Sequence, residues 1–308
     1  MGWYIGKRLL QMIPVFFGAT LLVYAMVFFI PGDPIQAMFG EKAVNPLIAQ
    51  QLREQFHLDQ PFYMQYLIWL KGIFQGDFGM SFSGRPVIDE IAQAYPVTVK
   101  LACIALCFEA VIGVILGVIA GLTKGKWFDT TALIISLLLI AVPTFVMGFL
   151  LQVVLGVKLQ WFPVTVGANQ SLEALVMPGF VLASVSIAYV LRLTRTSVAE
   201  NAHADYVRTA TAKGLRRGQV ISRHILRNSL IPVVTFLGVD LGALMGGAIV
   251  TEGIFNVPGV GNKLFQAIMR DQGPTIVSLV TILVIVFMVM SLLVDLLYAA
   301  LDPRIRLA

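Results

Sequence analysis

The charged side chains best able to make specific contacts are concentrated in one polar stretch, residues 205–232, between two long apolar segments. Residues 195–229 contain seven basic and two acidic side chains, an excess of five positive charges, which equals the formal net charge of the whole chain. Guanidinium groups bind carboxylates and phosphates through paired hydrogen bonds. The stretch lacks the aromatic stacking platform of a single-strand nucleic-acid binder. We therefore expect contacts with a protein or with the membrane surface, and no nucleic acid.

A second group of reactive side chains consists of four carboxylic acids within or near the ends of apolar runs: Glu109, Asp240, Glu252 and Asp295. Charges in such runs are expensive and usually face a cavity or a partner. Asp240 lies in the middle of its run and is the best candidate for lining a translocation path, although a structural role is the alternative. We expect Glu252 and Asp295, near the run ends, to reach the membrane interface.

No constellation typical of an enzyme is present in the sequence. The segment 121–127, GLTKGKW, lacks the spacing and the hydroxyl of a phosphate-binding loop. Cys103 and Cys107 lie four residues apart in an apolar run, and the three histidines are far apart, so we expect no metal site. We predict that the chain is not an enzyme and binds no cofactor. Energy for any transport must then come from a gradient or from another subunit.

The elements that position these residues are membrane spans. The chain has 308 residues, of which 58% are hydrophobic and only 13% are charged, about half the charged fraction of a soluble domain. Apolar runs of about 20 residues cross a hydrocarbon core of about 30 Å. We therefore predict an all-α integral membrane protein with six transmembrane helices, at residues 9–30, 101–122, 130–157, 174–191, 230–250 and 275–301. Pro143 and Pro178 should kink their spans.

The distribution of lysine and arginine predicts the orientation. Of the 22 lysines and arginines, 14 lie on one side of the membrane and seven on the other, in spite of its greater length, while Lys100 directly precedes a span. The basic side is cytoplasmic, which places both termini and the 205–232 stretch inside. We divide the chain into residues 1–30, an extracytoplasmic helical insert at 31–96, and a five-helix core at 97–308 with a cytoplasmic loop at 196–229. The insert is either a small capping subdomain or a docking surface over a pore mouth.

Glycines and a capping pattern predict local geometry. Asp205 can cap a short helix, and Gly214 can end it in the left-handed conformation. A second helix can restart near Gln219, with apolar side chains on one side at helical spacing: Val220, Ile221, Ile225 and Leu226. Glycines also recur every four residues within two spans, a spacing that allows helices to approach closely in lipid. We expect packing within one subunit, with a seam to a second subunit as the alternative. These glycines are Gly113, Gly117, Gly121, Gly238, Gly242 and Gly246.

Taken together, several short motifs resemble the inner-membrane permease subunits of ATP-binding-cassette importers, in the dipeptide, oligopeptide and nickel branch, and most closely a dipeptide B-type permease. The resemblance covers nearly the whole chain. Its marks are PGDP at 31–34, GDFGMS at 76–81, WFP at 161–163, DYVRTA at 205–210 with Lys213 and Gly214, EGIF at 252–255, PGVG at 258–261 and DPRIR at 302–306. The family pattern Glu-Ala-Ala, three residues, Gly is replaced here by Arg208, Thr209 and Ala210 with Gly214 in register.

The resemblance implies a type I ABC importer permease fold and a multi-pass protein of the bacterial inner membrane. It implies a homologous C-type permease partner, ATPase subunits (one fused chain or two) that hold ATP and Mg²⁺, and an extracytoplasmic substrate-binding protein. The expected cargo is a dipeptide or oligopeptide, with glutathione or a nickel chelate as alternatives, and the rival class is a gradient-driven secondary transporter. The implied ATPase-coupling residues are Asp205, Tyr206, Arg208, Thr209, Ala210, Lys213, Gly214, Arg216 and Arg217, with Tyr206 as the expected anchor.

Overall fold

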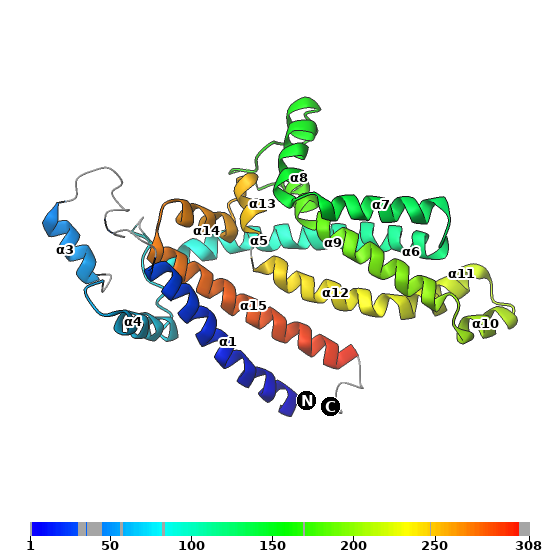
Figure 1. Cartoon of the computed structure of the whole chain (residues 1–308), viewed down its shortest axis with the longest axis horizontal. Coiled ribbons are helices and arrows are strands. Elements are labelled where there is room, and N and C mark those ends of the chain that lie inside the picture. Colours follow the sequence, from blue (N-terminus) through cyan, green and yellow to red (C-terminus); the bar gives the residue numbers. More distant parts are fainter. Residues whose placement is uncertain are drawn as a thin grey trace. The chain divides into compact units, whose positions relative to one another are not determined.

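The computed structural model describes residues 2–29, 35, 45–55, 58–81, 84–168, 170–246 and 248–301. The motifs at 31–34 and 302–306 lie outside these residues. The described chain is helical apart from loops and one isolated bridge between Met80 and Pro86, as Figure 1 shows. The all-α prediction is therefore confirmed.

Internal contacts divide the chain into two compact units. The first contains residues 1–98, 245–253 and 258–308, and the second contains residues 99–244 and 254–257. The boundaries predicted from the sequence, at residues 30 and 96, follow the expected membrane topology and remain predictions.

The first unit is built from helices that come from both ends of the chain. It contains α1 (Gly2–Phe28), α3 (Pro46–Gln55), α4 (Phe62–Phe74), the first half of α5 (Val87–Phe108), most of α13 (Ile249–Ile254), α14 (Val260–Met269) and α15 (Gly273–Leu301). α1 packs along α15, and Arg8 donates a 2.9 Å hydrogen bond to Asp295. Asp295 is thus held by an ion pair within the protein, and its position at the membrane interface stays a prediction.

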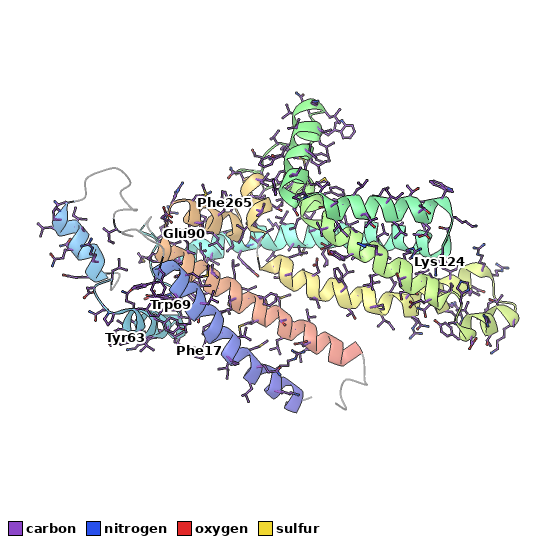
Figure 2. The ribbon with its side chains drawn as sticks, viewed as in Figure 1. Phe17, Tyr63, Trp69, Glu90, Lys124 and Phe265 are labelled. Atoms are coloured by element: carbon purple, nitrogen blue, oxygen red, sulfur yellow. The ribbon has the colours of Figure 1, made fainter. Side chains whose placement is uncertain are left out.

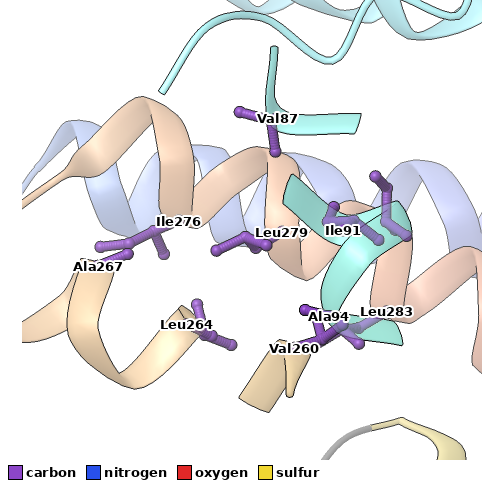
Figure 3. Packing of buried hydrophobic residues seen from close by; sticks show 10 residues of the cluster. Val87, Ile91, Ala94, Val260, Leu264, Ala267, Ile276, Leu279 and Leu283 are labelled. Carbon is purple, nitrogen blue, oxygen red and sulfur yellow. The ribbon is translucent and has the colours of Figure 1, made fainter. Parts of the chain in front are cut away.

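The apolar core of this unit joins α5, α14 and α15. Val87, Ile91 and Ala94 of α5 pack with residues of the other two helices, such as Leu264 and Leu279 (Figure 3). An aromatic cluster contributes at α1 and α4, where the Tyr24 and Trp69 ring centroids lie 5.4 Å apart. Trp69, Tyr63 and Phe17 are labelled in Figure 2. These residues of the insert belong to one helix, α4.

The second unit holds the longest buried helix. It contains the rest of α5, η1 (Glu109–Gly113), α6 (Val114–Leu122), α7 (Trp127–Ala141), α8 (Thr144–Leu151), η2 (Gln152–Lys158), α9 (Leu172–Asn201), α10 (Asp205–Ala212), α11 (Arg217–Gln219), η3 (Val220–Leu226) and α12 (Arg227–Met245). The η segments are π-helical turns. α6, α7 and α8 all pack against α9, and Figure 1 shows α9 running between α7 and α12.

Within the described ranges, five helices are long and apolar enough to cross a membrane by length and composition, and a bent pair provides a sixth candidate. The five cover residues 6–28, 87–122, 172–201, 217–245 and 273–296. The sixth span, predicted at 130–157, is not one kinked helix. It consists of two helices, Trp127–Ala141 and Thr144–Lys158, at an angle of 100°.

Proline explains the break between these two helices. Val142 precedes Pro143 and is extended, with φ −85° and ψ 120°, because the proline ring disfavours a helical conformation in the preceding residue. Pro178, which the sequence also suggested as a kink, lies within α9, which continues without a break to Asn201.

Candidate functional site: the α10 coupling element

The predicted coupling stretch forms a short helix carried at the end of α9 (Figure 1). α9 ends at Asn201, and α10 begins at Asp205 after a tight turn. Ala204, with φ −66° and ψ 149°, is the N-cap residue and makes no side-chain cap. The expectation that Asp205 caps α10 is therefore wrong. Asp205 is the first helical residue, where its negative charge still favours the positive end of the helix dipole.

One side of α10 is anchored in an apolar cluster. Val207 and Ala210 are buried together with Val198 of α9 and with Val220 and Ile225 of η3. The sequence correctly placed apolar side chains of the second helix on one side. Ala210 therefore supports α10 from inside, and direct contact with a partner falls to the opposite side of the helix.

That opposite side is polar and exposed. Tyr206, Arg208 and Thr209 are exposed, as are Lys213, Arg216 and Arg217 beyond the helix end. The Arg208 side chain is 74% exposed, and its contact with Asp205, 3.6 Å long, joins two solvated groups. Such exposed pairs add little stability, so Arg208 is available for another acidic group.

The turn after α10 requires glycine. Gly214 has φ +78°, a left-handed conformation that costs other residues free energy. The second helix then begins at Arg217, whose neighbour Arg216 donates its backbone N–H to Gln219 Oε1 at 3.3 Å. The predicted helix–glycine–helix arrangement is thus present.

Hydrogen bonds connect α10 back to the long helices. The Tyr206 hydroxyl donates to Asn201 Oδ1, and Asn201 Nδ2 donates to the Ser197 carbonyl at 2.9 Å. Ser229 of α12 donates its hydroxyl to the same carbonyl at 3.2 Å. Tyr206 is therefore partly engaged within the chain, which limits it as an anchor for a partner.

The glycines of η1 and α6 lie against α9. A Cβ atom on Gly113 would come within 2.7 Å of Val190 Cγ1, and one on Gly117 within 2.7 Å of the Leu191 carbonyl oxygen. These contacts are inside one subunit. In α12, Gly242 is buried and Gly238 is partly buried, whereas Gly246 follows the end of the helix, so the packing role of these three glycines stays a prediction.

Two carboxyl groups in the described part of the second unit have buried oxygens without a partner within hydrogen-bonding geometry. Glu109, at the start of η1, is 0% exposed, and neither of its oxygens has a hydrogen-bond partner. Asp240 of α12 is partly buried, and its Oδ2 atom also has no partner. Asp240 is an electrostatic neighbour of Glu109. The role of Asp240 along a path stays a proposal.

Sequence reasoning missed the role of Glu252, which it placed at the membrane interface. Glu252 is fully buried in the first unit. Its Oε1 accepts from the Thr98 hydroxyl at 2.8 Å, its Oε2 accepts from the Asn262 N–H at 2.9 Å, and Thr98 Oγ1 also accepts from the Val260 N–H at 2.9 Å. A Cβ atom on Gly259 would collide with Oε2. The EGIF and PGVG motifs were the sequence features that could have pointed to this site. The structure explains Gly259 of PGVG, because only glycine leaves space there for the Glu252 carboxylate.

Among the described residues, no group of three or more His, Cys, Asp and Glu side chains could hold a metal ion. The geometry of this region offers a short helix, α10, with an exposed polar side, at the end of the long helix α9.

Comparison with known proteins agrees with this geometry. Residues 113–307 match the family described as "Binding-protein-dependent transport system inner membrane component", and residues 1–102 match its N-terminal component. The chain is 34% identical to the dipeptide transport system permease protein DppB of Alkalihalophilus pseudofirmus, over 98% of this chain and 99% of that protein. It is 35% identical to the di/tripeptide permease protein DppB of Pseudomonas aeruginosa and 38% identical to the glutathione permease protein GsiC of Escherichia coli K12, in each case over 98% of both chains.

These matches cover both ends of the chain, and the apolar helices are those of a multi-pass membrane protein. They favour an ABC importer permease over the gradient-driven transporter that the sequence left as a rival. The chain belongs to the family of binding-protein-dependent transport system inner membrane components, the permease subunits of ABC importers.

Proposed function

We propose that this permease imports short peptides and is driven by ATPase subunits that dock on α10. The observation that carries the proposal is the two-sided construction of α10: Val207 and Ala210 fix it to α9 and η3, while Arg208 and Thr209 face outward. A short helix with a fixed inner side can transmit a push from a partner to the helices that hold it.

The energy comes from the partners in this proposal. The chain itself hydrolyses no ATP, and ATP and Mg²⁺ are bound by the ATPase subunits. In this proposal a homologous C-type permease completes the path and an extracytoplasmic binding protein delivers the substrate. The family description, which names dependence on a binding protein, supports the second of these partners. The insert at 31–96 faces that binding protein, and both chain termini lie in the cytoplasm.

The proposed substrate class rests on the relatives, which are named for dipeptide, di/tripeptide and glutathione transport. Unblocked peptides of two or three residues are the chemistry common to these names. Asp240 is the proposed acidic group along the path, where it would attract the ammonium group of the peptide.

The docking step is tested by charge reversal on α10 in the reconstituted complex. Arg208→Glu should reduce both co-purification of the ATPase subunits and peptide uptake, because it reverses an exposed charge on the docking side. Lys126→Glu, at an exposed lysine in the turn between α6 and α7, is the matched control and should retain both. Full ATPase association and uptake in Arg208→Glu would contradict the assignment of α10.

Two further measurements test the rest of the proposal. A photoreactive ATP analogue should label the ATPase subunits and leave this chain unlabelled. Uptake of labelled dipeptide, tripeptide, glutathione and a nickel chelate should show competition among the peptides. Exclusive transport of the nickel chelate would contradict the peptide assignment.

A further inference from the structure

An ion pair between α7 and α9 lies close to the coupling element in the chain. Arg195 of α9 approaches Asp129 of α7 through two parallel contacts: Nε to Oδ1 at 2.5 Å and Nη2 to Oδ2 at 2.7 Å. The Asp129 side chain is only 3% exposed, and that of Arg195 is 20% exposed. Two-pronged pairs of this kind fix orientation as well as distance.

The same carboxylate also holds the turn between α6 and α7. Asp129 Oδ2 accepts a hydrogen bond from the Gly125 N–H at 2.8 Å. Gly125 has φ +80°, a conformation that glycine adopts without strain. Asp129 therefore stabilises the α6–α7 turn through Gly125 and binds α9 through Arg195. The turn also contains Lys124, which is labelled in Figure 2.

Arg195 is contacted by α6 through its backbone. Gly121, in the last turn of α6, lies so close to α9 that a Cβ atom there would be 2.8 Å from the Arg195 carbonyl oxygen and 2.8 Å from Val198 Cβ. One residue of α9 thus contacts α6 through its carbonyl and α7 through its guanidinium. We call the pair Asp129–Arg195, with the Gly125 contact, the α7–α9 clamp.

Continuous contacts lead from this clamp to α10. Val198, about one helical turn after Arg195 in α9, belongs to the buried cluster that holds Val207. Ser197 accepts from Asn201, and Asn201 accepts from Tyr206. In the other direction, α7 leads to the extended residue Val142 and then to α8, at the 100° bend.

We propose that Asp129 is a positioning residue for coupling, because it makes the α6–α7 hairpin and α9 move as one body. Displacement of α10 by an ATPase then reaches α7 and, through the break at Val142 and Pro143, α8. Without the clamp, α9 would move with α10 while α7 lagged behind. This inference rests on the proposed docking of ATPases on α10.

The test separates coupling from folding. Asp129→Asn keeps the shape of the side chain but removes its charge. In the reconstituted complex we expect unchanged ATPase co-purification and continued substrate-stimulated ATP hydrolysis. Peptide uptake per ATP hydrolysed should fall about five- to tenfold, the size of a modest coupling free energy. Lys126→Gln, an exposed residue in the same turn, is the control and should keep the wild-type ratio.

A charge exchange provides the second arm. Asp129→Arg combined with Arg195→Asp restores an ion pair between α7 and α9 and should recover part of the lost uptake per ATP. This double variant also tests the proposal if Asp129→Asn fails to accumulate in the membrane. If Asp129 were only structural, uptake and ATP hydrolysis would fall in proportion, and an unchanged ratio would overturn the proposal. Failure of the docking proposal itself would show separately, as normal ATPase association in Arg208→Glu.

Discussion

Thr98 Oγ1 donates a 2.8 Å hydrogen bond to Glu252 Oε1, although the two residues lie 154 positions apart in the chain. The same threonine oxygen accepts the Val260 N–H, and Glu252 Oε2 accepts the Asn262 N–H. A buried carboxylate and a buried hydroxyl therefore satisfy the first backbone donors of α14. This arrangement holds α13, α14 and α5 together in the first unit.

Removal of the Glu252 carboxylate should destabilise this unit. Glu252→Ala leaves the Thr98 hydroxyl and the Asn262 N–H without their acceptor, at about 1–3 kcal/mol for each buried donor. Glu252→Gln keeps one carbonyl oxygen and should lose less. Denaturant unfolding of the purified complex would measure the order wild type, Gln, Ala. Equal stability of wild type and Glu252→Ala would contradict the role of this carboxylate.

The stability contributed by Glu252 should depend on pH. Burial raises the pKa of Glu252 above its ordinary value, and hydrogen bonds from Asn262 and Thr98 offset part of that rise. A raised pKa means that the folded state holds the proton more tightly than the unfolded state. The contribution is therefore complete below the unfolded pKa of about 4.3 and is lost as the pH rises through the folded pKa.

The control for this pH effect is Glu252→Gln, which does not titrate at this position. The unfolding free energy of the wild type minus that of Glu252→Gln should decrease as the pH rises above about 4.3. Unfolding curves over a pH series measure this difference. A difference that is constant or that increases with pH would show that the carboxyl is not held as the structure indicates.

The close approach of α6 to α9 predicts a large effect of one methyl group. A Cβ atom on Gly117 would be 2.6 Å from Thr194 Cβ and 2.7 Å from the Leu191 carbonyl oxygen. Gly117→Ala should therefore lower the unfolding free energy by about 1–3 kcal/mol through overpacking. Gly18→Ala in α1, where nothing lies within 4 Å, should have no such cost. Similar thermal stability of the two variants would argue against this helix contact.

The turn after α10 predicts a local effect. Gly214→Ala should destabilise the coupling element by about 1–2 kcal/mol, because alanine is strained in the left-handed conformation. Gly218→Ala is the matched control, since Gly218 has no positive φ and nothing within 4 Å of a new Cβ atom. Hydrogen exchange at the amides of 205–219 measures both. Faster exchange should appear only in Gly214→Ala.

The sequence was sufficient for features that depend on neighbouring residues. Apolar runs of spanning length identified the membrane helices, because burial in lipid requires uninterrupted apolar residues. Gly214 and the apolar positions around Val220 identified the helix–glycine–helix element, because a left-handed turn and helical spacing also depend only on nearby residues. The prediction was wrong for the cap at Asp205, because the tight turn after Asn201 makes Ala204 the last non-helical residue before α10 and therefore its N-cap.

The sequence also indicated that Pro143 disturbs its span, but a proline predicts a disturbance without its angle. The 100° bend depends on how α7 and α8 each pack against α9. Similarly, the glycine spacing of α6 predicted close packing, and only the structure identified α9 as the partner.

Sequence alone therefore determined the class of the protein, its membrane helices and the position of the helix–glycine–helix element, since these follow from composition, periodicity and local backbone preference. Tertiary structure decided which side chains meet. Glu252 with Thr98 and Asp129 with Arg195 are pairs from separate helices, and periodicity specifies which side of a helix is buried but not which residue lies opposite. The contacts that fix the coupling element and the end of α14 are of this long-range kind.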